Sequence, residues 1–289
     1  MSIIKVSDLT YCYGRGTPFE KVALDKVSFN IEKGEFVAII GHTGSGKSTL
    51  VSHLNGLITP ESGSVYLDGE DIFAKGYDLR TVRFKVGLVF QYPEYQLFEE
   101  TVYKDIAFGP KNMGLSDDEV KQRVIEAAKA LEIRPELLKK SPFELSGGQK
   151  RRVAIAGVIA MHPEVLVLDE PAAGLDPRGR ERVMRLIDDY RKSTGSTVVI
   201  VSHSMETAAK YADRVVVLNE GKLFFEGKPQ DLFRKTQELS EIGLSVPPIT
   251  RIFHKLISEG FDLPDNVYTA QRAAEIICEK CGKGGGGLC

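Results

Sequence analysis

A glycine-rich segment that joins an apolar run to a helix-forming stretch constrains the fold of this 289-residue chain more than any other feature. The segment reads GHTGSGKST over residues 41–49 and fits the pattern G-x-x-x-x-G-K-[ST], and residues 36–40 before it predict a buried strand. Glycines let consecutive backbone N–H groups turn toward one phosphate, and the N-terminus of the following helix adds partial positive charge. We therefore expect a phosphate-binding loop made of Gly41, His42, Thr43, Gly44, Ser45, Gly46, Lys47, Ser48 and Thr49.

Two side chains of this loop and an acidic strand end suggest the chemistry. Lys47 is expected to reach the β- and γ-phosphates of ATP, and the Ser48 hydroxyl is expected to ligand Mg²⁺. Asp169 and Glu170 directly follow the apolar run 165–168. Asp169 is the candidate for the Mg²⁺ shell, and Glu170 is the candidate to position or deprotonate an attacking water. The predicted cofactors are therefore ATP and Mg²⁺.

Short apolar or β-rich runs alternate with helical stretches along most of the chain. Such alternation predicts an α/β fold in which βαβ units build a largely parallel sheet. The helix predicted over residues 178–192 has Asp176 as its N-cap and Pro177 at its first position. The candidate strands cover residues 3–9, 27–31, 36–40, 64–67, 86–90, 165–168, 198–201 and 214–218.

Two segments depart from this alternation. Residues 101–161 favour helices alone, one of them opened by a capping box that begins at Ser116, so we expect a helical subdomain over about 92–161 within a domain of residues 1–227. Residues 228–289 predict a small helical extension with a flexible glycine-rich tail. One helix face there is apolar and is expected to strengthen association between subunits; it comprises Ile249, Ile252, Phe253, Leu256 and Ile257.

A second glycine motif lies in the predicted helical subdomain. Leu145 is followed by Ser146, Gly147, Gly148 and Gln149, and a helix comes next, so this is a second candidate anion-binding helix N-terminus. One ATP cannot easily contact both loops of a single chain if they lie on different subdomains. The second loop is therefore expected to serve the nucleotide of a partner chain. Taken alone, these five residues also fit an ordinary helix cap after a flexible turn.

Composition excludes several classes of protein. A net charge of −2 and a pI of about 6.3 give no general attraction to nucleic acid or to an anionic membrane. The apolar runs are too short to span a membrane, and the N-terminus predicts no secretory signal, so we expect a soluble chain that can still be a peripheral subunit. Cys12, Cys278, Cys281 and Cys289 are expected to be reduced thiols rather than a disulfide framework or a zinc site.

Over about residues 3–227 the chain resembles the ATP-binding cassette ATPases. The resemblance is carried by the phosphate loop, the signature LSGGQ at 145–149, the strand end LDE at 168–170, and Asp176 and His203 downstream. That resemblance implies a RecA-like P-loop NTPase core with an antiparallel β edge and an α-helical subdomain. It also implies that Gln91 senses Mg²⁺ and the γ-phosphate, that residues 173–176 cross a dimer interface, and that His203 contacts the γ-phosphate. Tyr13 matches the aromatic residue that stacks on adenine, and Tyr11 is the alternative.

A finer resemblance lies in residues 91–102 and 105–110, which are similar to the ATPases of energy-coupling factor transporters, as is the C-terminal extension. Residues 18–23 and 41–43 are similar to the second of the paired ATPases in those modules. The resemblance implies an ATPase at the cytoplasmic face of the cell membrane that powers uptake of vitamins or transition-metal ions. It implies three partners: a second ATPase subunit, the same or different, a transmembrane coupling subunit, and a substrate-binding membrane subunit. No nucleic acid is expected.

Several alternatives stay open from sequence. Tyr92, Tyr95, Leu97 and Phe98 could line a groove for the membrane subunit or could pack inward. Arg151 and Arg152 are expected to lie on a solvated helix face rather than in a phosphate site. The chain could also be a soluble ATPase of the same superfamily that is not linked to transport, or a non-catalytic nucleotide binder. Neither the transported substrate nor the homomeric or heteromeric pairing of the ATPases follows from the sequence.

Overall fold

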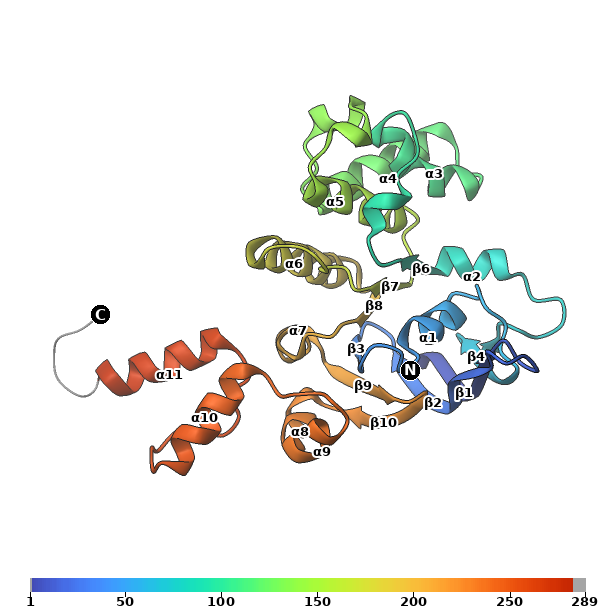
Figure 1. The fold of residues 1–289 in the computed structure, drawn as a ribbon. Coiled ribbons are helices and arrows are strands. Elements are labelled where there is room, and N and C mark those ends of the chain that lie inside the picture. The colour runs from blue at the N-terminus through green and yellow to red at the C-terminus, as the bar shows by residue number, and fades with distance from the viewer. Residues whose placement is uncertain (1, 283–289) are drawn as a thin grey trace.

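The computed structural model describes residues 2–282, which form two sheets flanked by helices (Figure 1). The larger sheet has six strands in the order β10-β9-β3-β8-β7-β6. All of its pairings are parallel except that of β10 with β9. Its strands are β3 (Phe36–Ile40), β6 (Val86–Val89), β7 (Val165–Asp169), β8 (Thr197–Val201), β9 (Arg214–Asn219) and β10 (Lys222–Gly227). The predicted α/β fold is confirmed.

The smaller sheet is antiparallel and has the order β2-β1-β4-β5. It comprises β1 (Ser2–Tyr13), β2 (Lys21–Glu32), β4 (Ser62–Leu67) and β5 (Glu70–Asp71). This is the expected antiparallel β edge, although β1 and β2 extend well beyond the predicted runs and β5 and β10 were not predicted. Lys21 and Val22, at the start of β2, are exposed, and no residue of β10 is buried, so the apolar periodicity that marks a strand in sequence is missing there.

The central strands are buried on both faces, as expected for a parallel sheet covered by helices. Every residue of β3, β7 and β8 is buried. Alternate residues of β3 enter two apolar clusters: Val37 and Ile39 face helix α1 (Lys47–Leu54) and the antiparallel sheet, whereas Phe36, Ala38 and Ile40 face α6 (Pro177–Thr194) and α7 (Met205–Tyr211). Apolar packing on the two faces of the larger sheet thus connects it to the smaller sheet and to its helices.

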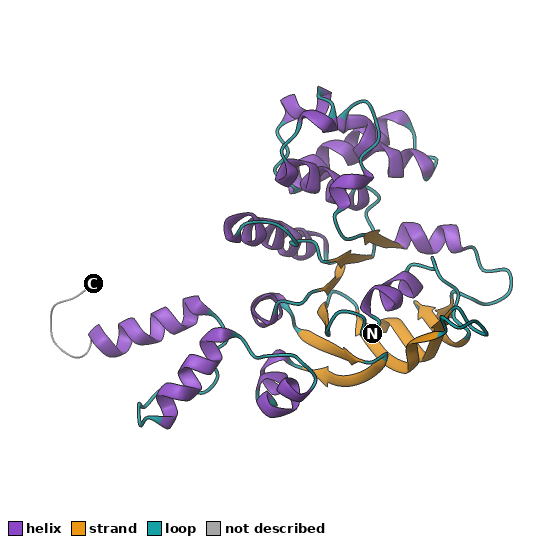
Figure 2. Ribbon diagram, in the orientation of Figure 1, coloured by secondary structure: helices purple, strands orange, loops and turns teal. Residues whose placement is uncertain are grey.

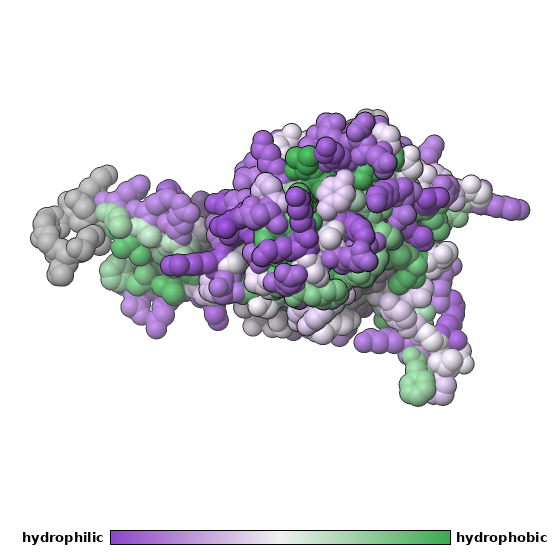
Figure 3. Space-filling model, turned by 90° about the horizontal axis from the view of Figure 1, so that it is seen from above, coloured by the Kyte–Doolittle hydropathy of each residue, from purple (hydrophilic) through white to green (hydrophobic). Residues whose placement is uncertain are grey.

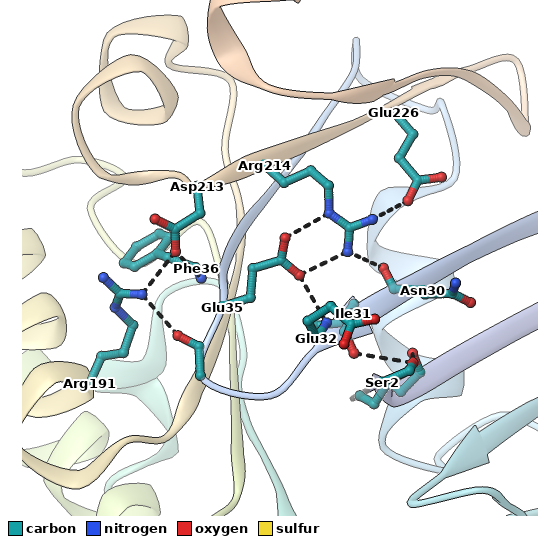
Figure 4. Close-up of polar contacts among 12 residues, drawn as sticks. Ser2, Asn30, Ile31, Glu32, Glu35, Phe36, Arg191, Asp213, Arg214 and Glu226 are labelled. Atoms are coloured by element: carbon teal, nitrogen blue, oxygen red, sulfur yellow. Dashed lines mark hydrogen bonds and ion pairs between the residues drawn. The ribbon is translucent and has the colours of Figure 1, made fainter.

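A group of ion pairs fixes the amino ends of the sheet strands (Figure 4). Arg214 donates through Nε and Nη2 to the two carboxylate oxygens of Glu35, at 2.7 and 2.8 Å. Arg191 donates to Asp213 at 2.9 Å, and the same Asp213 oxygen accepts from the backbone N–H of Phe36 at 2.8 Å. These contacts stabilise the entry into β3, at the edge opposite to the phosphate loop.

Helices fill the chain between β6 and β7, where the described residues contain no strand (Figure 2). After α2 (Leu79–Lys85) and β6 come the 3₁₀ turn η1 (Pro93–Gln96), α3 (Val102–Asn112), α4 (Asp117–Ala130), η2 (Pro135–Lys139), η3 (Pro142–Glu144) and α5 (Gly147–Ile159). The Ser116 capping box at the start of α4 is present as predicted. This helical group lies to one side of the sheet, away from α1 (Figure 1).

Within the described residues, four helices follow the last strand: α8 (Pro229–Phe233), α9 (Thr236–Glu241), α10 (Pro248–Ser258) and α11 (Ala270–Gly282). Leu232, Phe233 and Leu239 belong to the core cluster of the sheet, whereas α10 and α11 form a separate small cluster around Phe253. We call residues 247–282 the C-terminal arm. The domain limits predicted at 92, 161 and 227 stay predictions, and the packing favours counting α8 and α9 with the sheet domain.

The C-terminal arm extends from the body of the molecule, and apolar side chains gather on its surface (Figure 3). Ile252, Phe261 and Ile277 are among its exposed apolar residues, whereas Phe253 points into the arm. Within residues 2–282, no helix combines the length and the apolar character needed to cross a membrane. Cys12 is buried and Cys278 is exposed, both as free thiols. The Cys281 side chain, Cys289 and the tail 283–289 lie outside the described residues.

Candidate active site

The phosphate loop connects β3 to α1 in the arrangement that the sequence predicts. Gly46 caps α1 with a φ of 102°, and a Cβ atom there would lie 2.4 Å from the carbonyl oxygen of Ala23, so only glycine fits. The buried Lys47 ammonium donates hydrogen bonds to the carbonyl oxygens of Gly41 and His42, at 2.9 and 2.8 Å. The positively charged end of Lys47 therefore lies inside the loop. Burial lowers the pKa of Lys47, and the carboxylates of Glu170 and Asp169 oppose that shift.

Strand β7 brings the acidic pair to the loop. The Ser48 side chain lies beside the Asp169 carboxylate, so two predicted Mg²⁺ ligands from distant segments are neighbours. Burial raises the pKa of Asp169, while Ser48 and the charges of Lys47 and His203 lower it. A hydroxyl and a carboxylate are hard oxygen ligands of the kind that Mg²⁺ prefers, so these residues fit that ion.

Glu170 occupies a constrained position next to the end of β7. Its φ is 51°, and its backbone N–H donates to the carbonyl oxygen of Val201 at 3.1 Å, which holds the segment after β7 against β8. Burial, and then the neighbouring charge of Asp169, raise the pKa of Glu170 to about 7. A carboxylate with a pKa near neutral is suited to accept a proton from water.

His203 lies opposite this carboxylate. Its Nε2 atom is 3.2 Å from Oε1 of Glu170, and its ring lies beside the backbone of Gly41. Burial and the Lys47 charge lower the pKa of His203. Glu170, His203 and Arg180 line a cavity of about 280 Å³ at this edge of the sheet. Strands β7, β8 and β3 thus bring Glu170, His203 and the phosphate loop together.

A second cavity, of about 230 Å³, lies on the outer side of the phosphate loop and is lined by Tyr13, Lys21, Gly44, Lys47 and Thr49 among others. The Tyr13 ring is 44% exposed, and its hydroxyl is 3.2 Å from Oγ1 of Thr49. Tyr11 packs inward against the buried His53, at 5.0 Å between ring centroids. Of the two tyrosines, Tyr13 is therefore the one placed to stack on a base.

Comparison with known proteins decides the family. Residues 24–173 match the family model described as ABC transporter. The chain is 53% identical over 274 residues to the energy-coupling factor transporter ATP-binding protein EcfA2 of Caldanaerobacter subterraneus subsp. tengcongensis, covering 95% of this chain and 96% of the relative. It is 50% identical to the protein of the same name from Clostridioides difficile, over the full length of both.

This chain belongs to the ATP-binding subunits of energy-coupling factor transporters, within the ABC transporter family. Among solved structures it resembles cbiO1 from Clostridium perfringens, part of the ABC transporter complex cbiONQ, with a TM-score of 0.75, 40% identity, and coverage of 88% of this chain and 98% of that one. It also resembles the ATP-binding cassette MJ0796, solved as a dimer bound to ADP and Pi, with a TM-score of 0.70, 32% identity, and coverage of 78% and 98%. The predicted P-loop NTPase fold and ATPase activity are confirmed.

The energy-coupling factor ATPase carries its LSGGQ signature apart from the phosphate loop. Ser146 caps α5: its hydroxyl oxygen accepts from the N–H of Gln149, and the Gln149 side chain accepts from the N–H of Ser146 in return, at 3.4 and 2.9 Å. Apart from chain neighbours and the backbone of the same helix, no atom of the described residues lies within 4 Å of a Cβ placed on Gly147 or Gly148, so this helix N-terminus is open. It belongs to the helical group, away from α1 (Figure 1). The signature thus does not meet the chain's own phosphate loop.

The remaining predicted residues lie around this site. Gln91 is exposed and follows β6, at the same sheet edge as Asp169 on the neighbouring β7. Asp176 caps α6, and its Oδ1 accepts from the N–H of Gly179 at 2.6 Å. Lys21 is a residue that the sequence did not single out. It faces Tyr13 across the β1–β2 pairing, and such a register contact has no local signal in the sequence.

One prediction about the signature helix needs correction, and the structure decides an alternative that the sequence left open for the loop after Gln91. Arg151 and Arg152 are buried rather than solvated, because Arg151 is enclosed by segments that lie far away in the sequence. Leu97 is also buried, and it belongs to the core cluster, whereas Tyr92, Tyr95 and Phe98 are exposed. Only the aromatic members of that loop are therefore available to a partner of the energy-coupling factor ATPase.

Proposed function

We propose that this energy-coupling factor ATPase binds Mg²⁺–ATP between Tyr13, the phosphate loop and the acidic end of β7, and powers uptake through a membrane partner. The observation that supports the site best is the convergence of Lys47, Glu170 and His203 at one edge of the sheet. Ser48, Gln91 and Asp169 would hold Mg²⁺, which neutralises charge on the phosphates when bound. Tyr13 would stack on adenine, and all nine residues from Gly41 to Thr49 would surround the phosphates.

The side chains of this site have distinct roles in the proposal. The Lys47 ammonium stabilises negative charge on the β- and γ-phosphates. Glu170 accepts a proton from the attacking water, and His203, within ion-pair distance of Glu170, contacts the γ-phosphate. These roles divide binding from hydrolysis, so substitutions at Lys47 and Glu170 are expected to have different kinetic effects.

We infer that the working unit contains two ATPase chains. The signature at Ser146–Gln149 is open and distant from the loop of its own chain, so it is free to face the nucleotide of a second ATPase, the same or different. The segment that ends at Asp176 would lie at that interface. A transmembrane coupling subunit and a substrate-binding membrane subunit complete the assembly, which places this chain peripherally at the cytoplasmic face of the membrane. The membrane subunits would select the cargo, a vitamin or a transition-metal ion.

A surface for the membrane subunit lies beside Gln91. Tyr95 is 85% exposed and Phe98 is 60% exposed, and Phe98 packs edge-on against Phe108 at 5.0 Å. Phe98 and Phe108 line an apolar cavity of about 280 Å³ that continues onto α5. Because Gln91 begins the same loop, a change at the nucleotide site can move this surface and any membrane helix that is bound to it.

We expect the double substitution of Tyr95 and Phe98 by glutamate to spare ATP binding and to uncouple the ATPase from transport. Charges placed in an apolar docking surface cost on the order of 1–3 kcal/mol each. The variant is reconstituted with its membrane subunits, and assembly and ATP-driven uptake are measured. Ile125→Glu, an exposed apolar position on α4, is the matched control. Normal assembly with normal uptake would show that the coupling surface lies elsewhere.

We also expect the C-terminal arm to strengthen association between ATPase subunits. A chain that ends at Val246 keeps Leu232, Phe233 and Leu239 in the core but lacks the arm. Its dissociation constant for the partner ATPase should rise by about tenfold or more, since burying one large apolar side chain is worth roughly 1.5–3 kcal/mol. ATP affinity should stay unchanged. Sedimentation measures the association, with Ile252→Asp as a point variant, and equal affinity of all three proteins would refute the role.

A further inference from the structure

One buried guanidinium contacts the loop after Gln91 and the segment after Glu170. Arg151 lies on α5 and is only 2% exposed. Its Nε and Nη2 atoms donate to the two carboxylate oxygens of Glu94, at 3.0 and 2.6 Å. Its Nη1 atom donates to the carbonyl oxygen of Ala173 and lies 3.5 Å from that of Pro171. The side chain thus makes a two-pronged ion pair on one side and backbone contacts on the other.

These contacts connect three segments that the proposed mechanism uses. Arg151 follows the signature residues Ser146–Gln149 on the same helix. Glu94 lies in η1, three positions after Gln91 and next to the exposed Tyr95. Ala173 follows Glu170 and precedes Asp176, and its own N–H donates to the carbonyl oxygen of Glu170 at 3.1 Å. One side chain therefore joins the signature helix, the loop toward the membrane subunit, and the segment that carries Glu170.

The geometry favours arginine at this position. A guanidinium is planar, so it can donate two hydrogen bonds to one carboxylate and a third in another direction. A lysine ammonium cannot reproduce that pattern. The neighbouring Arg152 is a useful contrast. It is also buried, but its charged neighbours are Glu132, Arg134 and Arg182, away from the loop after Gln91. The contact with both functional loops is thus particular to Arg151.

We propose that Arg151 is a positioning residue, paired with Glu94, that makes the segment Glu170–Asp176 follow movements of the signature helix and of the loop after Gln91. The inference rests on the proposed function, because it assigns a route between the membrane-facing loop and Glu170 in the same chain. Movement of α5 by a partner would shift the carbonyl of Ala173 through the guanidinium. The position of Glu170 then depends on the contact between Arg151 and Ala173, although Glu170 itself does not touch Arg151.

The test uses the complex that this chain forms with its membrane subunits. ATP turnover is measured with the parent chain and with Arg151→Lys, Glu94→Gln, and the double variant Arg151→Met with Glu94→Leu. Turnover of the Glu170→Gln complex is subtracted, which removes the contribution of a second, different ATPase. Lys150→Met, an exchange at the adjacent position of the same helix, is the control.

We expect Arg151→Lys and Glu94→Gln to lower kcat by about tenfold with the KM for ATP changed less than twofold, because a small misplacement near the reacting groups is costly while the phosphate loop is untouched. The double variant replaces a buried ion pair by apolar side chains, which can restore thermal stability. We expect it to regain parental stability but not parental kcat. The Lys150→Met complex should behave as the parent.

Parental turnover by a double variant of parental stability would overturn the inference, since the pair would then serve only packing. Equal losses in kcat and in ATP affinity would also overturn it, because the phosphate loop would be disturbed. Failure of the proposed function has a different signature: the parent complex itself would then show no turnover above that of the Glu170→Gln complex.

Discussion

Replacing Glu170 by glutamine is expected to lower ATP turnover at the sites that this chain supplies by roughly 10²–10⁴ while nucleotide binding survives, the size of effect expected when a general base is lost. Glutamine keeps the shape of the side chain but cannot take a proton from water. Lys47 and Ser48, which we propose bind the nucleotide and its metal ion, belong to a different segment and are unchanged. The complex of two ATPase chains with ATP should therefore accumulate, because closure still occurs and hydrolysis no longer reopens it.

Turnover is measured by phosphate release, and bound nucleotide is measured on the isolated complex. Glu206→Gln is the matched control, since Glu206 is an exposed carboxylate in the first turn of α7, just beyond His203. Hydrolysis by the Glu170 variant at near the parental rate would show that another group accepts the proton. Burial and the charge of Asp169 raise the pKa of Glu170 to about 7, which makes its carboxylate a stronger base than that of an exposed glutamate.

Replacing Lys47 by alanine is expected to weaken ATP binding itself, by about 10- to 100-fold, since hydrogen bonds to a charged group are worth roughly 1.5–3 kcal/mol. The substitution removes the ammonium that the loop carbonyls of Gly41 and His42 hold in place. It also removes a positive charge that interacts with the carboxylates of Asp169 and Glu170. Binding and turnover should therefore fall together.

A titration with ATP measures the affinity of the Lys47 variant, and Lys121→Ala on the exposed face of α4 is the control of equal charge change. Wild-type affinity for the variant would remove Lys47 from the binding site. The pair of substitutions thus separates the two roles: Lys47→Ala should act on binding, and Glu170→Gln should act on the hydrolytic step after binding.

The parts of the site that the sequence predicted are those with local signals. The phosphate loop is one continuous segment, so the positions of its glycines, Lys47 and Ser48 are set by residues next to them in the sequence. Asp169, Glu170 and His203 follow short apolar strands, and parallel strands deliver their carboxyl ends to one edge of the sheet. The caps at Ser116 and Asp176 also depend on residues only three positions away.

The parts that were missed depend on contacts between distant segments. Two adjacent arginines on a helix, such as Arg151 and Arg152, suggest a solvated face when only nearby residues are considered. Arg151 can be buried because it pairs with the carboxylate of Glu94, which lies 57 positions away in the sequence. Leu97 and Phe98 are neighbours of similar hydrophobicity, yet one is buried and the other exposed, since the 3₁₀ turn before them sets the direction of each side chain. Lys21 reaches the nucleotide cavity only through the pairing of β1 with β2.

ATP turnover by the complex that co-purifies with this chain from membranes decides whether the chain powers transport. We expect the complex to contain a membrane subunit and to hydrolyse Mg²⁺–ATP. We expect Glu170→Gln to lower that turnover by about 10² or more if both ATPase positions hold this chain, and by about half if a second, different ATPase keeps an active site of its own. Purification of the chain without any membrane protein, or turnover unchanged by Glu170→Gln, would show that this chain does not drive a membrane subunit by hydrolysis at Glu170.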